Sequence, residues 1–511
     1  MEIMRSSKAI WIIASALLVL YLASINNEIT PVYDSTTYLL LAESLVAGQG
    51  YSSIYLAGDP PHATYPYVYP GILAPLVGLF GRSFWVFKCL TALFAFGSLV
   101  LCYRLLLTRA GHGEALVIVA LVGLHPRFGN FAHSILSEMP FLFFTLLYFL
   151  SLERYEKNDR ALSRAGALSL LLLVLCIFTR TIGLALLPAT LLFLLLSGRK
   201  QNTMGLALRK IAFIVTGTGL PVAMWVMRLG AIRSVDPYSY ANTFLRDHPH
   251  QVGDSVIPLN VLADRFFEGI ANNVTHFATL SFNHHYLVPL PGVAWILSAL
   301  VLIGFVRVLK KGVRAEELYV FFTVAFLLVW PYSYARYLIP LLPFIVRYFL
   351  SSVTMISKRL EVIHPGLRRS FLISAVIAVI ALSSLASTIK HNPVKEHRTP
   401  YLRGPWPDLR AMNYWMKENL EPSSLVMSRY EQFVYWNSGL KCVSMKYGVE
   451  PESVERRFHE TGPNVLLIDP FEGEMRWKMS LVCLVKKHPD RFQRLHRIGS
   501  ATLYEVLDQQ D

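Results

Sequence analysis

Charged side chains are scarce in this chain. Asp, Glu, Lys and Arg make up only 16% of its 511 residues, whereas hydrophobic residues make up 54%. Soluble domains carry about a quarter charged residues, so this chain has too few charges to face water on every side. The mean hydropathy of +0.42 agrees with that shortage. The composition therefore speaks against a soluble enzyme and predicts a mainly α-helical, polytopic membrane protein.

Cysteine is also rare. The chain has five cysteines, with no C-x-x-C pair and no zinc-finger spacing among them. This shortage excludes a disulfide-rich scaffold and a cysteine-based zinc module. Cys442 and Cys483 lie in the polar C-terminal part and can pair if that part lies outside the cytoplasm, but their spacing does not decide the question.

Acidic residues are outnumbered by basic ones. The 48 Lys and Arg against 34 Asp and Glu give a formal net charge of +14. In a soluble protein this excess would indicate a nucleic-acid partner. In a membrane protein, basic residues collect in the cytoplasmic loops instead. We therefore expect no nucleic-acid partner.

Long apolar runs dominate the chain. Eleven of them are long enough, or nearly so, to cross a bilayer as helices. They span residues 9–25, 84–107, 113–126, 138–153, 164–179, 181–197, 206–228, 289–308, 316–334, 337–355 and 370–389. The first run follows Arg5 and Lys8 as a secretory signal would, but it has the length of a full span. We interpret it as a retained first helix.

Lysine and arginine gather in alternate connecting segments, among them 307–314 and 358–369. Basic loops mark the cytoplasmic side, so the N-terminus is predicted inside and residues 390–511 outside. The outer side then holds two long loops, 26–83 and 229–288. We expect function to lie on this elaborated face of a transmembrane domain comprising residues 1–389.

Residues 390–511 differ from the rest in composition. Predicted helices alternate there with short apolar strands, and this alternation indicates a small extracytoplasmic α/β domain. The predicted helices are 407–420, 450–461 and 475–488, and the predicted strands are 423–428, 441–445, 464–469 and 501–507.

An aspartate, Asp34, stands near the start of the first outer loop. Apolar residues recur at helical spacing after it, which predicts an amphipathic helix over 35–47 lying along the membrane surface. An aspartate at a helix start is a good N-cap. It can also act as a base if one carboxylate oxygen stays accessible. The spacing leaves both interpretations open.

Three more charged residues stand at predicted outer helix ends. They are Glu138 in LSEMPFLFF, Arg180 in TRTIGLALLPA and Arg336 in ARYLIPLLPF. Charges at membrane depth are costly and indicate function. However, Glu138 also suits an ordinary helix start after Ser137, and an arginine can either snorkel to the interface or bind a phosphate.

Aromatic residues are concentrated in PPHATYPYVYPG, which contains His62, Tyr65, Tyr67 and Tyr69. Aromatics at this depth form an interfacial belt, or they stack on a sugar ring. The histidine pair at 284–285 is a weak metal candidate, because the local sequence offers no matching ligands.

These motifs together resemble those of the GT-C superfamily of integral-membrane glycosyltransferases. The closest likeness is to bacterial members similar to protein O-mannosyltransferases and the lipid A aminoarabinose transferase, and it covers essentially the whole chain. It includes Asp34, the Y-x-x-x-A pattern from Tyr38, the G-x-G-Y at 48–51, the tyrosine-proline run and the three segments quoted above. Two departures stand out: Ser35 replaces the glutamate that many members carry after the aspartate, and Thr181 replaces the usual proline.

The resemblance implies a GT-C-like fold in a bacterial inner (plasma) membrane. It implies a sugar donor linked to polyprenyl phosphate, membrane lipids around the protein, and a lipid, protein or glycan acceptor at the outer face, with inversion of the anomeric centre. Asp34 is then the base, and Glu138 is the second acid, which orients a substrate or holds a divalent cation. By position, Arg180 and Arg336 are candidates for binding the donor phosphate. Candidate sugar- or acceptor-binding residues are Tyr38, His62, Tyr65 and Tyr337.

Two other functions compete with this one. A transporter or flippase of lipid-linked sugar should carry its charged or glycine-broken positions at mid-membrane in both halves. Here the conspicuous polar residues lie at outer helix ends, which favours the enzyme. A non-catalytic relative that binds polyprenyl phosphate is the other alternative, because Ser35 leaves one acid missing.

Overall fold

The computed structural model describes residues 2–29, 33–231, 244, 257–281, 291–364, 366, 368–390, 405–443, 450–471 and 475–507. The histidine pair at 284–285, and much of the predicted outer loop 229–288, lie outside these residues. The chain forms two compact units. Unit 1 comprises Met1–Asn26, Phe87–Trp225 and Leu262–Val394, and unit 2 comprises Asn27–Val86, Val226–Val261 and Lys395–Asp511.

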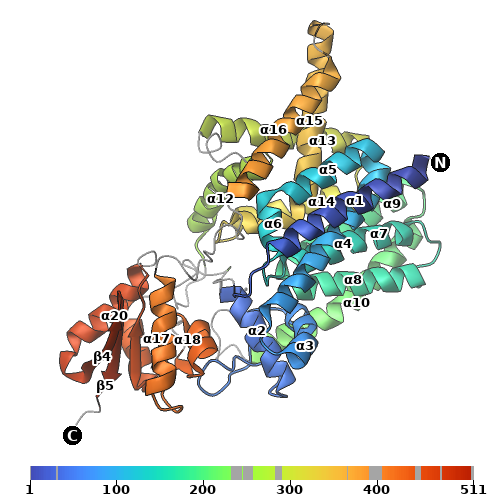
Figure 1. The fold of residues 1–511 in the computed structure, drawn as a ribbon. Coiled ribbons are helices and arrows are strands. Elements are labelled where there is room, and N and C mark those ends of the chain that lie inside the picture. Colours follow the sequence, from blue (N-terminus) through green and yellow to red (C-terminus); the bar gives the residue numbers. More distant parts are fainter. Residues whose placement is uncertain are drawn as a thin grey trace. The chain divides into compact units, whose positions relative to one another are not determined.

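Every predicted apolar run coincides with a helix of the described chain (Figure 1). The helices are α1 (Glu2–Ala23), α4 (Phe84–Ala110), α5 (His112–Leu124), α6 (Pro126–Ala132), α7 (Glu138–Glu156), α8 (Arg164–Thr179), α9 (Leu186–Lys200), α10 (Met204–Ala231), α13 (Pro291–Lys311), α14 (Ala315–Val329), α15 (Leu342–Ile363) and α16 (Arg369–Lys390). Among the described residues, six helices are long and apolar enough to cross a membrane, or seven if α5 and α6, bent by 68°, form one span. The protein is therefore a multi-pass membrane protein, and the count of eleven spans stays a prediction.

Two helices occupy regions that the sequence assigned to outer loops. They are α12 (Leu259–Ser281) and α3 (Val68–Phe80). Polar residues such as Asp264 and Asn273 lie within α12, so its sequence is not a continuous apolar run. Prolines are common in loops, yet α3 contains Pro70 near its start and Pro75 in its interior.

A glycine allows two helices of unit 1 to pack closely. A Cβ added at Gly304 of α13 would lie 1.8 Å from the carbonyl oxygen of Tyr348 on α15. Polar contacts cross the same interface: the Ser352 hydroxyl donates to the Leu300 carbonyl oxygen at 2.6 Å, and the Arg307 guanidinium donates to the Ser351 carbonyl oxygen at 3.0 Å. Small residues and side-chain hydrogen bonds of this kind hold membrane helices together.

Unit 2 contains α2 (Tyr33–Val46), which packs against α3. The helix predicted over 35–47 is thus confirmed, but its amphipathic character is wrong, and its position along the membrane surface stays a prediction. Residues 35–42 are all buried, including the hydroxyl-bearing Ser35 and Thr36. The serines and threonines gave the sequence its apparent polar face, but these small side chains are buried here together with the apolar ones.

The rest of unit 2 contains a five-stranded sheet with the strand order β2-β1-β3-β5-β4. The strands are β1 (Val426–Met427), β2 (Cys442–Val443), β3 (Val465–Ile468), β4 (Phe492–Ile498) and β5 (Ala501–Val506). Strands β2, β1 and β3 run parallel, and β5 and β4 are antiparallel to their neighbours. The mixed sheet agrees with the predicted α/β character.

Helices cover this sheet (Figure 1). They are α17 (Trp406–Asn419), α18 (Glu431–Ser438), α19 (Pro451–Thr461) and α20 (Met475–Lys487). Val454 and Phe458 of α19 and Leu481 of α20 share a buried core with Leu466 and other residues of the strands. The four predicted strands and three predicted helices are confirmed, whereas the polar strand β4 and the short helix α18 were missed.

The first outer segment joins the edge of the sheet. The Cys442 amide donates to the Tyr55 carbonyl oxygen at 2.9 Å, and the Ala57 amide donates to the Cys442 carbonyl oxygen at 3.0 Å. Lys441 bonds Asp59 at 2.7 Å. Cys442 is a buried free thiol and Cys483 an exposed one, so the two do not pair in this structure. A domain boundary at residues 389/390 stays a prediction, because segment 27–86 clusters with the C-terminal part.

Candidate functional site

A buried carboxylate stands at the start of α7 in unit 1. The helix begins at Glu138, with Ser137 as the flanking residue and a proline in the first turn. Glu138 is fully buried, with 0% of its surface exposed. A negative charge in a first helical turn is favoured by the helix dipole. Full burial nevertheless requires a nearby cation to offset the cost of removing the carboxylate from water.

Two arginines supply that positive charge. The Arg180 Nη1 atom lies 2.8 Å from Glu138 Oε1, and the Arg336 Nε atom lies 2.9 Å from the same oxygen. Arg180 also donates to the Ser137 hydroxyl at 3.0 Å. The sequence motifs LSEMPFLFF, TRTIGLALLPA and ARYLIPLLPF therefore meet at one point of unit 1, although Glu138 and Arg336 are 198 residues apart.

Both arginines stand where a helix is interrupted. Arg180 ends α8 in an extended conformation (φ −149°, ψ 134°), and the 3₁₀ segment η1 (Thr181–Ala185) follows it. Arg336 lies in the 3₁₀ segment η2 (Ala335–Leu341), directly before α15. Proline at 340 and the glycine at 183 interrupt regular helix in these motifs. The breaks leave each long side chain at a helix end, where it can reach Glu138.

This group brings two guanidinium groups and one carboxylate together, with the Arg180 side chain 10% and the Arg336 side chain 22% exposed. Glu138 Oε2 is buried and accepts no hydrogen bond within the described chain. Guanidinium forks match carboxylate and phosphate oxygens, so two partly buried arginines side by side are suited to an anion.

A second buried charge network in unit 1 has equal numbers of positive and negative side chains. Arg109 pairs with Glu153 and Glu316, and Arg347 pairs with Glu317 at 2.8 Å. With Arg314, which lies 3.6 Å from Glu153, this network has three cations and three anions. Its neutrality fits a structural role in joining α4, α7, α14 and α15. The group around Glu138 differs from this network in having two arginines on one carboxylate oxygen.

In unit 2, Asp34 lies within the first turn of α2 and is half-buried. The Tyr65 hydroxyl donates to Asp34 Oδ1 at 2.5 Å. A short bond from a phenol to a carboxylate is among the stronger protein hydrogen bonds. The helix start at Tyr33 places Asp34 inside the helix rather than at its cap, a difference of one residue that helix assignments do not resolve by themselves.

His62 holds the loop that presents Tyr65. The Tyr65 amide donates to His62 Nε2 at 3.0 Å, which makes that nitrogen an acceptor. The proton of the neutral ring then lies on Nδ1, which bonds the Ser53 hydroxyl at 3.0 Å. The His62 ring stacks on Tyr65 with the ring planes 12° apart. His62 is 1% exposed and uses both nitrogens, which fits a supporting role.

Arg228 of α10 bonds to the backbone of the same loop. It donates to the His62 carbonyl oxygen at 2.7 Å and to the Tyr51 carbonyl oxygen at 3.2 Å. The Tyr51 hydroxyl in turn donates to the Tyr65 carbonyl oxygen at 3.0 Å. Sequence reasoning gave no role to Arg228, and it quoted Tyr51 only as part of the G-x-G-Y motif, because bonds to backbone carbonyls cannot be read from a sequence.

Aromatic rings surround Asp34 and its partner. Tyr38, one turn after Asp34, packs against Tyr65 and Tyr69 with ring centroids 5.0 Å apart in both cases. Tyr38 and Tyr69 are nearly fully buried, whereas Tyr67 is exposed. Tyr337, beside Arg336 in unit 1, is half-buried and lies 5.9 Å from the ring of Tyr334. A sugar or acceptor contact for Tyr38, His62, Tyr65 and Tyr337 stays a prediction.

Of the predicted residues, Glu138, Arg180 and Arg336 form one group, and Asp34, Tyr38, His62 and Tyr65 form another. The two groups belong to different compact units. A single site that joins Asp34 to Glu138 therefore stays a prediction. As a metal site, Glu138 is poorly suited, because the guanidinium groups on its Oε1 would repel a divalent cation.

No protein-family model matches the chain, and no curated protein does. Solved structures do match it. ArnT from Cupriavidus metallidurans bound to undecaprenyl phosphate aligns with a TM-score of 0.57 and 12% identity, covering 98% of both chains. The archaeal oligosaccharyltransferase AglB from Archaeoglobus fulgidus, in complex with an inhibitory peptide and a dolichol-phosphate, aligns with a TM-score of 0.51 and 11% identity, covering 90% of this chain and 69% of that one.

The chain therefore shares the fold of these two membrane proteins. The match extends over the whole chain and includes both compact units. An oligosaccharyltransferase from Archaeoglobus fulgidus, solved in complex with Zn and sulfate, also aligns, with a TM-score of 0.55 and 12% identity over 89% of this chain and 67% of that one. The structural alignments establish a shared fold, but the sequence identities are too low to establish a shared activity. An argument about activity must therefore rest on the residues around Asp34 and Glu138.

Proposed function

We propose that this protein is a GT-C-type glycosyltransferase that moves a sugar from a polyprenyl-phosphate donor to a lipid, protein or polysaccharide acceptor at the outer face of the membrane. In this proposal the chain crosses the membrane eleven times, with the N-terminus in the cytoplasm and residues 390–511 outside. The observation that carries the proposal is the convergence of Arg180 and Arg336 on buried Glu138. ArnT, which has the same fold, is solved with undecaprenyl phosphate bound.

The two neighbouring guanidinium groups meet the main requirement of the donor, which is positive charge at its phosphate. A phosphate ester at a helix break offers oxygens to both guanidinium groups, and Glu138 keeps the two arginines at a fixed separation. Hydrogen bonds to charged groups contribute about 1.5–3 kcal/mol each. Positive charge beside the phosphate also stabilises it as a leaving group, so that it departs without a proton.

Asp34 acts on the acceptor in this scheme. It removes the proton of the attacking hydroxyl or amine as the bond from that atom to the anomeric carbon forms. The bond from the anomeric carbon to the phosphate oxygen breaks at the same time, and its electron pair leaves on the lipid phosphate. One displacement inverts the anomeric centre. Tyr65 holds one carboxylate oxygen of Asp34 in a fixed position.

Tyr38, His62, Tyr65 and Tyr337 shape the sugar and acceptor sites in this proposal, with His62 acting through its support of Tyr65. Metal chemistry at Glu138 is disfavoured by the two guanidinium groups. A divalent cation therefore has no step in the scheme.

Binding and transfer should be tested separately. Undecaprenyl phosphate binding to the detergent-purified protein is measured by native mass spectrometry for the wild type, Arg180→Gln and Arg336→Gln. Arg314→Gln is the control, because it also removes a guanidinium beside a glutamate in unit 1 but belongs to the neutral network. We expect each of the first two variants to weaken binding by at least about 10-fold, from the loss of one charge-assisted bond, and the control to bind normally.

Transfer is read from the cell-envelope glycans of a strain that depends on this protein. Asp34→Asn should abolish the glycan while it keeps lipid binding. Normal glycan levels with Asp34→Asn would contradict the base assignment and favour a non-catalytic lipid-binding relative. Transport of a lipid-linked sugar by Asp34→Asn vesicles at the wild-type rate would identify a flippase instead.

A further inference from the structure

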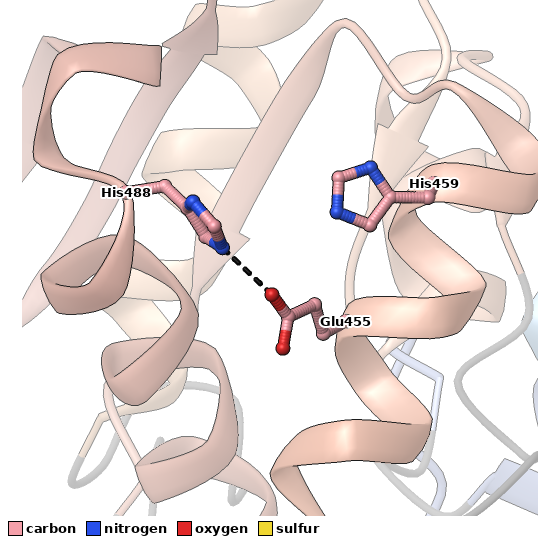
Figure 2. A group of neighbouring side chains, drawn as sticks. All are labelled: Glu455, His459 and His488. Atoms are coloured by element: carbon pink, nitrogen blue, oxygen red, sulfur yellow. Dashed lines mark hydrogen bonds and ion pairs between the residues drawn. The ribbon is translucent and has the colours of Figure 1, made fainter.

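A cluster of potential metal ligands lies in unit 2, apart from the residues discussed above. Glu455, His459 and His488 each offer a ligand atom, and these atoms lie within 4.8 Å of one another (Figure 2). Glu455 and His459 come from α19, and His488 directly follows α20. All three side chains are half-buried or exposed, so an ion can reach them from solvent.

The helix determines half of this geometry. Glu455 and His459 are four residues apart on α19, and residues at that spacing lie on the same helix face. Val454 and Phe458, one position earlier in each case, are buried in the core, so the face with Glu455 and His459 borders it. The same i, i+4 spacing places two metal ligands on one face in known helical zinc motifs.

His488 already points one ring nitrogen at the Glu455 carboxylate. Its Nε2 lies 2.7 Å from Glu455 Oε1, which is a hydrogen bond with one proton between the two atoms. A metal ion at about 2.1 Å from each atom would take the place of that proton and separate the pair slightly. Lys487 bonds the other oxygen, Oε2, at 2.6 Å and orients the carboxylate. The Lys487 side chain is 63% exposed, so solvent screens its charge, unlike the guanidinium groups beside Glu138.

His459 is the third ligand. Its ring lies 6.2 Å from the His488 ring, with the planes at 89°. Hydrogen bonds and ion pairs of His459 are absent from the described part of the chain, so a ring nitrogen is available. Because the side chain is exposed, rotation can bring it the ångström or so that tetrahedral coordination requires. An ion pair of Glu455 with Lys487 and His488 does not require His459, whereas a metal ion uses it.

We propose that Glu455, His459 and His488 bind one Zn²⁺ ion. Two imidazoles and one carboxylate are a common zinc ligand set, and they leave a fourth position open to water or to an anionic group. The ion would join α19 to α20, the two helices that pack on the same part of the sheet. This proposal is independent of the transfer chemistry at Asp34 and of phosphate binding at Arg180.

The test uses the full-length protein, purified in detergent with an affinity tag that contains no histidine and stripped of metal by a chelator. Zn²⁺ is titrated against a chromophoric chelator as competitor. We expect one Zn²⁺ per chain for the wild type. Loss of an outer-shell partner weakens metal sites by about 10–100-fold, so His459→Ala and Glu455→Gln, which each remove a ligand, should weaken binding by more than about 10-fold.

Glu452→Gln is the matched control, since it removes an exposed carboxylate from the same helix and should bind Zn²⁺ like the wild type. Co²⁺ gives a second readout, because its visible absorption reports the ligand geometry directly. The wild type should show this absorption, and His459→Ala, an exposed position whose change leaves the fold intact, should lose it. Equal Zn²⁺ binding by the wild type and His459→Ala, or no binding by the wild type, would overturn the proposal.

Discussion

The hydrogen bond from Tyr65 to Asp34 allows a clean test of the proposed base. Tyr65→Phe removes a single hydroxyl, the donor that lies 2.5 Å from Asp34 Oδ1. The phenylalanine ring can keep the stacking on His62 and the contact with Tyr38 at a centroid distance of 5.0 Å. The substitution therefore changes the position and charge environment of Asp34 and leaves the packing of the loop intact.

The size of the effect follows from the type of bond. A hydrogen bond to a charged group contributes about 1.5–3 kcal/mol. If the whole of this amount is lost in the transition state, the rate falls by about 10- to 150-fold, at 1.36 kcal/mol for each factor of ten. We expect kcat to fall within this range while the affinity for undecaprenyl phosphate stays unchanged, because the phosphate is assigned to Arg180 and Arg336.

The assay is sugar transfer by membranes that contain equal amounts of each variant, together with lipid binding by the purified proteins. Tyr67→Phe is the control, since Tyr67 lies on the same loop and is exposed. It should transfer sugar at the wild-type rate. A Tyr65→Phe protein that transfers sugar as fast as Tyr67→Phe would refute the role assigned to the Asp34–Tyr65 pair.

Two further predictions concern stability. Gly304→Ala should lower the thermal unfolding temperature markedly, because its Cβ would lie 1.8 Å from the Tyr348 carbonyl oxygen, whereas Gly292→Ala in the same helix meets nothing within 4 Å and should be neutral or slightly stabilising. The buried pair Arg429–Asp469, joined at 2.9 Å, should show non-additive losses: Arg429→Met and Asp469→Leu alone cost about 3–5 kcal/mol each, and the double variant costs less than their sum. Burial raises the pKa of Asp469 even beside Arg429, so a carboxyl left alone by Arg429→Met favours its protonated form when folded, and the loss in this variant should grow as the pH rises from about 4 towards 7. Equal losses at both pH values in urea titrations would contradict that reasoning.

Helices and strands with strong local patterns were predictable from the sequence. The apolar runs became helices, and the strand 464–469 became β3, buried on both faces. The strand β4 was missed because its sequence, FQRLHRI, is largely polar and exposed, and only its pairing with β5 makes it a strand. The pairing of β4 with β5 depends on tertiary contacts, which the local propensity of the β4 sequence does not predict.

The candidate site shows the same limit. Glu138, Arg180 and Arg336 were chosen because each charge interrupts an apolar stretch, and this signal is local. The signal does not reveal that both arginines bond the same oxygen, since that depends on how α7, η1 and η2 pack. Arg228 also interrupts an apolar stretch, but its partners cannot be read from the sequence, because they are the carbonyl oxygens of Tyr51 and His62, which every residue type possesses.

The burial of Ser35 bears on the difference between this residue and the glutamate that the sequence resemblance led us to expect at this position. Its side chain is 0% exposed, and its hydroxyl, like that of Thr36, has no hydrogen-bond partner among the residues the structure describes. A glutamate at this position would bring a carboxylate into a fully buried place, at a cost of several kcal/mol unless it met a cation or took up a proton. Glu138, which is paired with two guanidinium groups, shows how this chain does hold a carboxylate away from water.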